Sequence, residues 1–220
     1  MQKTRFQNAS SIFNKGENME ITQIVSDILD SNVFVCQNGR STFIFDCGTE
    51  LDKVREAVKG KVAAIFLTHG HYDHAKYALE YAKAFGCKIY ANKNITEILP
   101  DPAKNYGENF LIRDFSDFVF LEGDGQVDID GQNIEYFHCP GHSKCCTCFL
   151  IGDDFFTGDV LFAQGIGRTD LFGGSKAQML NSLQKLQNVP FERAHSGHGA
   201  DSSKANQDKN VKVFLRFLSR

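Results

Sequence analysis

A continuous apolar run over residues 62–67, with the sequence VAAIFL, constrains the fold more than any other feature of the chain. The run shows no alternation of apolar and polar side chains, which is typical of a strand that is covered on both faces. Directly after it, residues 68–74 read THGHYDH. The fold must therefore bury this strand and also present a polar loop at its carboxyl end, where sites in α/β proteins are usually built.

The polar loop itself predicts a metal site. Histidine supplies only seven of the 220 residues, yet His69, His71 and His74 fall within this loop together with Asp73. Side chains two residues apart in an extended loop point the same way, so His69 and His71 can share one cation. Asp73 and His74 enter the next predicted helix and can bind a second cation beside the first. This concentration of imidazoles disfavours the alternative of a solvated polar loop.

Four side chains cannot complete the coordination of two cations, so further His or Asp residues are expected in other loops. Three candidates stand at the ends of predicted strands, each beside a glycine: His142, Asp159 and His198. Glycine allows a tight backbone path that aims a short side chain inward. The predicted ligands therefore come from four separate segments of the chain.

The rest of the chain predicts an α/β protein with a four-layer αββα sandwich. Two β-prone runs, 33–36 and 41–46, flank Asn38 and Gly39, a strong hairpin signal. Further strands are predicted over 88–91, 118–121, 133–137, 147–151, 154–157 and 191–194. The spacing of apolar residues predicts helices over 51–58, 75–85, 176–186 and 211–218. Two strand-rich halves, each with helices to cover its outer face, predict two sheets packed face to face.

Charge and hydropathy exclude several classes of partner. The formal net charge is −3, from 24 Lys and Arg against 27 Asp and Glu, so no positive field favours nucleic acid or an anionic membrane. No segment approaches the roughly 20 apolar residues that cross a bilayer.

Residues 1–18 lack the apolar core of a secretory signal and are expected to form a flexible N-terminal arm. A single domain is expected over residues 19–220. The oligomeric state is not predicted.

The seven cysteines are expected to be reduced thiols of a cytoplasmic protein, because their number is odd and no secretory signal accompanies them. Cys145, Cys146 and Cys148 lie close together, but the second pair that a zinc knuckle needs does not follow them. Of the remaining histidines, His138 and His195 are expected to be structural rather than to orient a ligand.

In order and residue type, the candidate ligands resemble the signature of the metallo-β-lactamase superfamily. That signature is H-x-H-x-D-H, here at residues 69–74, followed by a distant His, a bridging Asp and a last His. The segments TGDVLF (157–162), GRTDL (167–171) and GHG (197–199) look like the glyoxalase II-like, or hydroxyacylglutathione hydrolase-like, branch. The resemblance covers about residues 20–200 and implies the metallo-β-lactamase fold.

The resemblance also implies a role for each ligand. It assigns the first metal to His69, His71 and His142, and the second metal to Asp73, His74 and His198, with Asp159 as the bridge. Two divalent cations are expected; this mixed set of N and O ligands suits zinc best and would also accept iron or manganese. A hydroxide shared by the two metals would attack a carbonyl group, and Asp73 would orient it.

The implied substrate is a small-molecule thioester, such as the glutathione thioester S-lactoylglutathione. A thiolate leaves easily, which matters because the motifs supply no spare acid to protonate a poorer leaving group. Arg168, in a glycine-rich loop after Asp159, is a candidate substrate-binding residue. Its guanidinium would either pair with a carboxylate of the thiol carrier or brace the loop through an acid such as Asp170.

Four other functions are compatible with the same fold. A mononuclear-iron sulfur dioxygenase acting on glutathione persulfide has the same ligands, and a hydrolase of another ester or lactone is a further alternative. A secreted β-lactamase is disfavoured because Asp159 stands where the zinc lactamases use Cys. A non-catalytic binding module would be expected to have lost a ligand, and none is missing.

Overall fold

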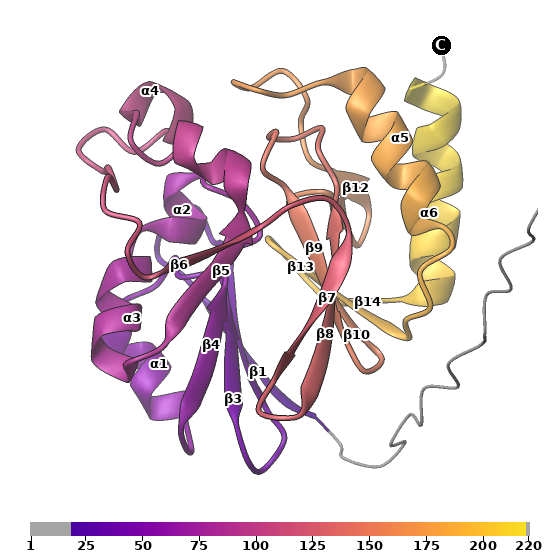
Figure 1. Ribbon diagram of the computed structural model, residues 1–220. Coiled ribbons are helices and arrows are strands. Elements are labelled where there is room, and N and C mark those ends of the chain that lie inside the picture. Colours follow the sequence, from indigo (N-terminus) through magenta and orange to yellow (C-terminus); the bar gives the residue numbers. More distant parts are fainter. Residues whose placement is uncertain (1–18, 219–220) are drawn as a thin grey trace, which may run out of the picture.

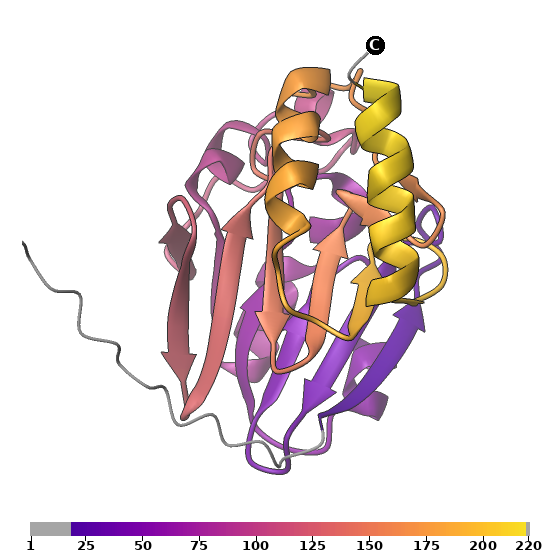
Figure 2. The same ribbon diagram turned by 90° about the vertical axis from the view of Figure 1, so that its right-hand side faces the viewer.

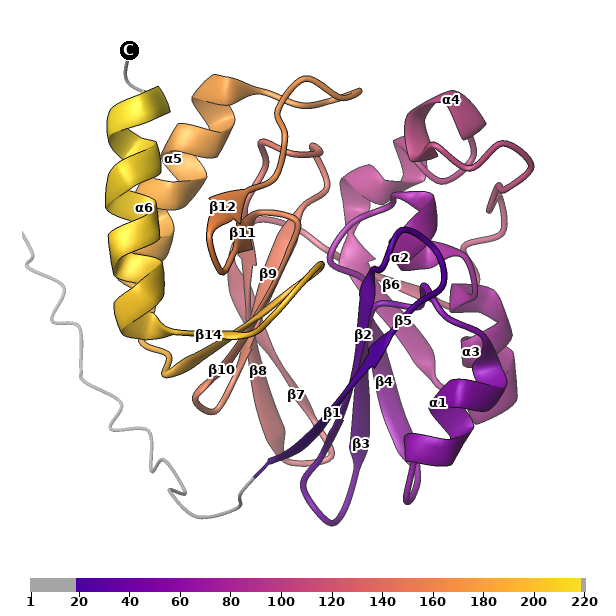
Figure 3. The same ribbon diagram turned by 180° about the vertical axis from the view of Figure 1, so that it is seen from behind.

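The computed structural model describes residues 19–218, and the predicted arm 1–18 lies outside the described residues. Two six-stranded sheets pack face to face, and helices cover the outer face of each (Figure 1). The predicted four-layer αββα sandwich is confirmed. The view from behind shows the same four layers in reverse order (Figure 3).

The first sheet has the strand order β1-β2-β3-β4-β5-β6. The strands are β1 (Glu20–Val25), β2 (Asn32–Gln37), β3 (Thr42–Phe45), β4 (Val62–Phe66), β5 (Lys88–Asn92) and β6 (Phe118–Leu121). The first two pairings are antiparallel and the other three are parallel. The apolar run forms β4, which lies inside the sheet between β3 and β5, as its lack of alternation predicts.

The second sheet has the order β14-β13-β10-β9-β8-β7. Its strands are β7 (Gly125–Ile129), β8 (Gln132–His138), β9 (Thr147–Ile151), β10 (Asp154–Gly158), β13 (Arg193–Ser196) and β14 (Ser202–Ser203). A small hairpin of β11 (Leu161–Phe162) and β12 (Gly165–Ile166) follows β10. Figure 2 shows α5 (Lys176–Leu186) and α6 (Lys204–Leu218) over the outer face of this sheet. No helix within residues 19–218 has the length and apolarity needed to cross a membrane.

The predicted helix 75–85 is wrong as a single element. Two helices form instead, α2 (Tyr72–Ala75) and α3 (Ala78–Phe85), and Lys76 and Tyr77 separate them. The break arises because Cys47 uses the backbone groups that would continue the helix. The Cys47 N–H donates to the carbonyl of His74, and the Cys47 carbonyl accepts from the Tyr77 N–H. A residue distant in sequence thus ends the helix that carries two candidate ligands.

The remaining helices of the first half are short. They are α1 (Leu51–Ala57), the 3-10 helix η1 (Lys93–Glu97) and α4 (Pro102–Asn105). The hairpin predicted at Asn38 and Gly39 joins β2 to β3, and the Asn38 side chain accepts hydrogen bonds from the N–H groups of Arg40 and Ser41.

Other boundaries also differ from the predictions. The edge strands β1 and β7 were not predicted, because neither contains a buried residue and their apolar pattern is weak. Helix α6 begins at Lys204 rather than at 211, since its first two turns are largely polar. Strand β13 lies two residues later than 191–194, because Phe191 packs on Phe155 in the core before the strand begins.

Aromatic side chains hold the two sheets together. Phe45 of β3 stacks on Phe156 of β10 with ring centroids 3.8 Å apart and an interplanar angle of 3°. Phe66 stacks on Phe45 from within the first sheet, and Phe149 of the second sheet contacts both rings. These rings are buried, so the interface between the sheets is a continuous aromatic layer.

We expect Phe45→Ala to destabilise the protein by about 3–5 kcal/mol, because it leaves a cavity at the contact between the sheets. Urea unfolding measures this free energy. Phe120→Ala is the matched control: Phe120 is 39% exposed whereas Phe45 is 1% exposed, so its loss should cost much less. Equal losses of stability in the two variants would contradict the role assigned to Phe45.

Candidate metal centre

The structure brings all seven predicted ligands together at one end of the sandwich. His69 and His71 lie in the loop between β4 and α2, and Asp73 and His74 lie in α2 itself. His142, Asp159 and His198 come from loops of the second sheet. Their ligand atoms fall into three overlapping groups, and within each group the atoms lie within 4.8 Å of one another. The cluster therefore joins the two halves of the molecule.

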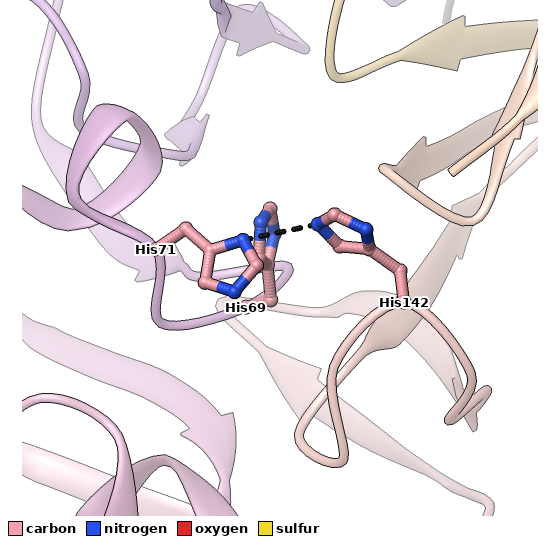
Figure 4. A group of neighbouring side chains, drawn as sticks. All are labelled: His69, His71 and His142. Carbon is pink, nitrogen blue, oxygen red and sulfur yellow. Dashed lines mark hydrogen bonds between the residues drawn. The ribbon is translucent and has the colours of Figure 1, made fainter. Parts of the chain in front are cut away.

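The first group consists of His69, His71 and His142, all buried (Figure 4). Nδ1 of His71 lies 3.0 Å from Nε2 of His142. The His69 ring is nearly perpendicular to both other rings, with centroids 4.6 Å and 5.1 Å away. Three imidazoles from two segments thus meet at one point, as the assignment of the first metal requires.

The second group consists of Asp73, His74 and His198. Nε2 of His74 lies 3.3 Å from Nε2 of His198. One oxygen of Asp73 lies 3.3 Å from the His74 nitrogen and 3.2 Å from the His198 nitrogen. This arrangement is the one expected for the second metal.

Asp159 lies between the two groups. One of its oxygens is 3.4 Å from Nε2 of His74, and the other is 3.4 Å from Nε2 of His142. Its carboxylate therefore faces both groups at once, which is the position that a bridging ligand needs.

The spacing of these atoms fits divalent cations. In a tetrahedral zinc site, metal–ligand bonds of about 2.0–2.1 Å place neighbouring ligand atoms about 3.3 Å apart. The ligand nitrogens and oxygens described above are separated by similar distances. Nε2 of His69 and Oδ1 of Asp159 are also buried without a hydrogen-bond partner among the described residues. A buried polar atom without a partner is costly, and a metal ion would satisfy both.

The electrostatic environment differs between the two groups. Burial lowers the pKa of His69 and of His142, and it lowers the pKa of His71 to about 3, so all three imidazoles are neutral near pH 7. Burial acts in the same direction on His74 and His198, but nearby carboxylates outweigh it. They raise the pKa of His74 and bring the pKa of His198 to about 9. Because metal ligands must be unprotonated, a cation in the second group would replace these protons.

Asp46, which follows β3, is a functional residue that the sequence analysis missed. One of its oxygens accepts from the Thr68 N–H at 2.7 Å. The other accepts from the Thr68 hydroxyl and from Nδ1 of His74, both at 2.8 Å. The Thr68 hydroxyl in turn lies 3.0 Å from Nδ1 of His69. Asp46 thereby fixes the ring orientation of one ligand in each group.

Two glycines beside the ligands have identifiable roles. Gly158 has a φ of 49°, a left-handed conformation that turns the chain into Asp159. A Cβ on Gly197 would lie 2.2 Å from Oδ1 of Asp159 and 2.9 Å from the His74 ring. The first glycine supplies a backbone conformation, and the second supplies room for the cluster.

His138 and His195 lie apart from the three ligand groups, in agreement with their predicted structural roles. Nε2 of His138 lies 2.8 Å from the carbonyl of Lys144. His195 is buried between Asp154, at 2.8 Å, and Asp201, at 2.9 Å. The seven cysteines are free thiols, and none belongs to a ligand group found among residues 19–218.

Arg168 contributes to the site through its backbone. Its carbonyl oxygen lies 2.9 Å from Nδ1 of His142 and so orients that ring. The guanidinium makes a two-bond pair with Asp170, with both distances 2.8 Å. This is the loop-bracing contact that the sequence offers as one of its two alternatives. A role in substrate binding stays a prediction.

We expect Asp46→Asn to weaken metal binding about 10- to 100-fold, because the ligand rings lose the carboxylate that orients them. Competition with a chromophoric chelator measures the affinity. Asp154→Asn removes another buried acid that holds a histidine, His195, outside the ligand groups. That control should bind metal normally, and an Asp46→Asn protein of unchanged affinity would refute the orienting role.

Asp159→Ala should lower the metal content from two ions per chain to one, because His69, His71 and His142 still form a complete group. Elemental analysis after saturation with Zn²⁺ and gel filtration measures this ratio. Asp52→Ala, which removes an exposed acid of α1, serves as control. Two ions retained by Asp159→Ala would remove this residue from the bridging position.

Comparison with known proteins agrees with this geometry. Residues 27–198 match the metallo-β-lactamase superfamily. The chain is 32% identical to a probable metallo-hydrolase, YqgX of Bacillus subtilis, over 83% of this chain and 92% of that protein. It is 30% identical to the hydroxyacylglutathione hydrolase GloC of Haemophilus influenzae, over 82% and 90% of the two chains.

Solved structures show the same fold. The B3 metallo-β-lactamase BLEG-1 is 28% identical, with a TM-score of 0.81 over 89% of this chain and 99% of that chain. TTHA1623, solved in a di-iron-bound form, is 25% identical, with a TM-score of 0.74 over 86% and 98% of the two chains. The sequence match, the four-layer fold and the clustered ligands together show that this chain belongs to the metallo-β-lactamase superfamily.

Proposed function

We propose that the protein is a hydrolase that uses two divalent metal ions to cleave thioesters. The observation that carries this proposal is the complete set of seven ligand side chains, with Asp159 facing both groups. Two relatives support the choice of chemistry, because GloC of Haemophilus influenzae and a second protein, from Shewanella baltica, are named hydroxyacylglutathione hydrolases.

Bound cations of this kind supply a hydroxide at neutral pH and polarise the carbonyl group that it attacks. The protein's own groups position these components. Asp46 holds His74 and, through Thr68, His69 in fixed orientations. Asp73 presents a carboxylate oxygen beside His74 and His198, where it can accept a hydrogen bond from the nucleophile and so orient it.

A thioester suits this arrangement because its leaving group needs no proton. All seven clustered groups serve as ligands in the proposed site, so none of them is free to protonate an amine or an alkoxide. A thiolate leaves without such assistance. We therefore place thioesters ahead of amides and ordinary esters, and S-lactoylglutathione is the first substrate to test.

The test is hydrolysis by protein loaded in turn with Zn²⁺, Fe²⁺ and Mn²⁺. We expect turnover of S-lactoylglutathione or of a simpler thioester, with a kcat/KM of at least about 10⁴ M⁻¹s⁻¹ for the best substrate. Removing the metal should lower the rate at least about 100-fold, and adding it back should restore the rate.

A lactone, a β-lactam and glutathione persulfide complete the panel. Hydrolysis of the lactone or the β-lactam alone would keep the metallohydrolase assignment and overturn the thioester assignment. Oxygen uptake with glutathione persulfide, without hydrolysis of any ester, would instead identify an iron-dependent sulfur dioxygenase.

A further inference from the structure

We propose that Tyr106 and Phe172 form an aromatic wall beside the first ligand group that binds the thiol carrier of the substrate and sets specificity for it. This inference rests on the proposed thioesterase function. It concerns the part of the substrate that does not react, so it can be tested separately from the chemistry.

Tyr106 is held in an unusual backbone conformation. It ends α4 with a φ of 62°, in the left-handed region that residues other than glycine seldom adopt. The fully buried Asn105 side chain maintains this turn. It donates to the carbonyls of Leu99 and Phe110 and accepts from the Gly107 N–H. Such strain persists only where the surroundings enforce it, and it is concentrated at functional sites.

The left-handed turn places the Tyr106 side chain beside His71 of the first ligand group. Its ring lies 5.2 Å from the ring of His71, at an angle of 81°. Its oxygen accepts a hydrogen bond of 2.6 Å from the backbone N–H of Phe172. Tyr106 therefore links the α4 segment of the first half to a loop of the second half, next to the first ligand group.

The loop that carries Phe172 is anchored at both ends to the segment that carries His142. The Arg168 carbonyl contacts the ring of His142, and the Ser175 N–H donates to the carbonyl of Gly141. Figures 1 and 3 show this loop, between β12 and α5, reaching across the top of the sandwich towards α4. The wall thus spans the two halves and has a fixed position relative to the cluster.

Both rings of this wall remain partly exposed, and the charged side chains beside them are paired. Tyr106 is 48% exposed and Phe172 is 41% exposed, although both are large hydrophobic residues. Lys104 lies over the Phe172 ring at 5.0 Å and pairs with Asp101, and Arg168 pairs with Asp170. The wall therefore offers a substrate two aromatic faces rather than a free cation.

This chemistry favours a carrier that is recognised through amide and alkyl groups, since such groups pack on aromatic faces without needing a charge partner. Thiol carriers built from amide units have this character. We expect the wall to contribute to binding of the carrier and to contribute little to the bond-breaking step.

Fluorescence provides a readout of binding that needs no turnover. The chain contains no Trp, so Phe172→Trp creates a single tryptophan at the wall. Phe120→Trp is the matched control, because Phe120 is similarly exposed, at 39%, and lies on β6. Titration of the metal-loaded variants with the unreactive thioethers S-hexylglutathione and S-hexyl-N-acetylcysteamine should change the emission of the first variant and leave the second unchanged.

Steady-state kinetics separate binding from chemistry. Tyr106→Phe keeps the ring and loses the hydrogen bond to Phe172, and it should raise KM about 3- to 10-fold. Tyr106→Asn removes the ring while keeping a residue that tolerates the left-handed turn, and it should raise KM more. For both variants, kcat and metal content should stay within about 2-fold of the values for the unsubstituted protein. A thioester with a minimal carrier, methyl thioacetate, should be affected little.

Two results would overturn the proposal. One is an unchanged emission of Phe172→Trp with both thioethers. The other is an equal loss of kcat/KM for carrier-bearing and minimal thioesters in the Tyr106 variants, which would indicate a structural role only. If the original protein hydrolyses no thioester, the proposed function fails; a fluorescence response would then still support the wall, and its absence would refute the wall as well.

Discussion

The carboxylate of Asp46 is the contact on which the metal centre depends. It is buried at the end of β3 and receives hydrogen bonds from the backbone and side chain of Thr68 and from His74. A buried carboxylate is tolerated only when its oxygens are satisfied in this way. The Asp46 carboxylate accepts hydrogen bonds both from Thr68, which follows β4, and from the ring of His74. The first sheet therefore fixes the orientation of this ligand.

Docking of the second half completes the site. The Asn32 N–H donates to the carbonyl of Gly197 at 2.7 Å, and the Asn32 side chain donates to the carbonyl of Ser196. These bonds hold the turn that carries His198 against the start of β2. Together with the stacking of Phe45 on Phe156, they position the ligands of the second sheet relative to the loop after β4. The same packing therefore determines both the stability of the sandwich and the spacing of the ligands.

Local patterns were sufficient to predict much of this structure. The uninterrupted apolar run predicted β4, and the histidines that follow it predicted the cluster, because both signals are contained in a few consecutive residues. The relation between distant residues was harder to predict. Asp46 has no histidine near it in sequence, and its role depends on β3 lying beside β4. The break before α3 likewise arises from Cys47, which no helical pattern around Tyr77 contains.

The candidate substrate contacts beside the cluster were harder still to predict from the sequence. The sequence left Arg168 with two alternatives, and the structure shows its pair with Asp170. Tyr106 and Phe172 were not singled out, because they are separated by 66 positions and meet only when the halves pack together. Metal ligands are set by the chemistry of the cation and so form a recognisable pattern in sequence. Substrate contacts are set by loops that vary on a common fold, so the proposed aromatic wall follows no pattern that can be recognised in the sequence alone.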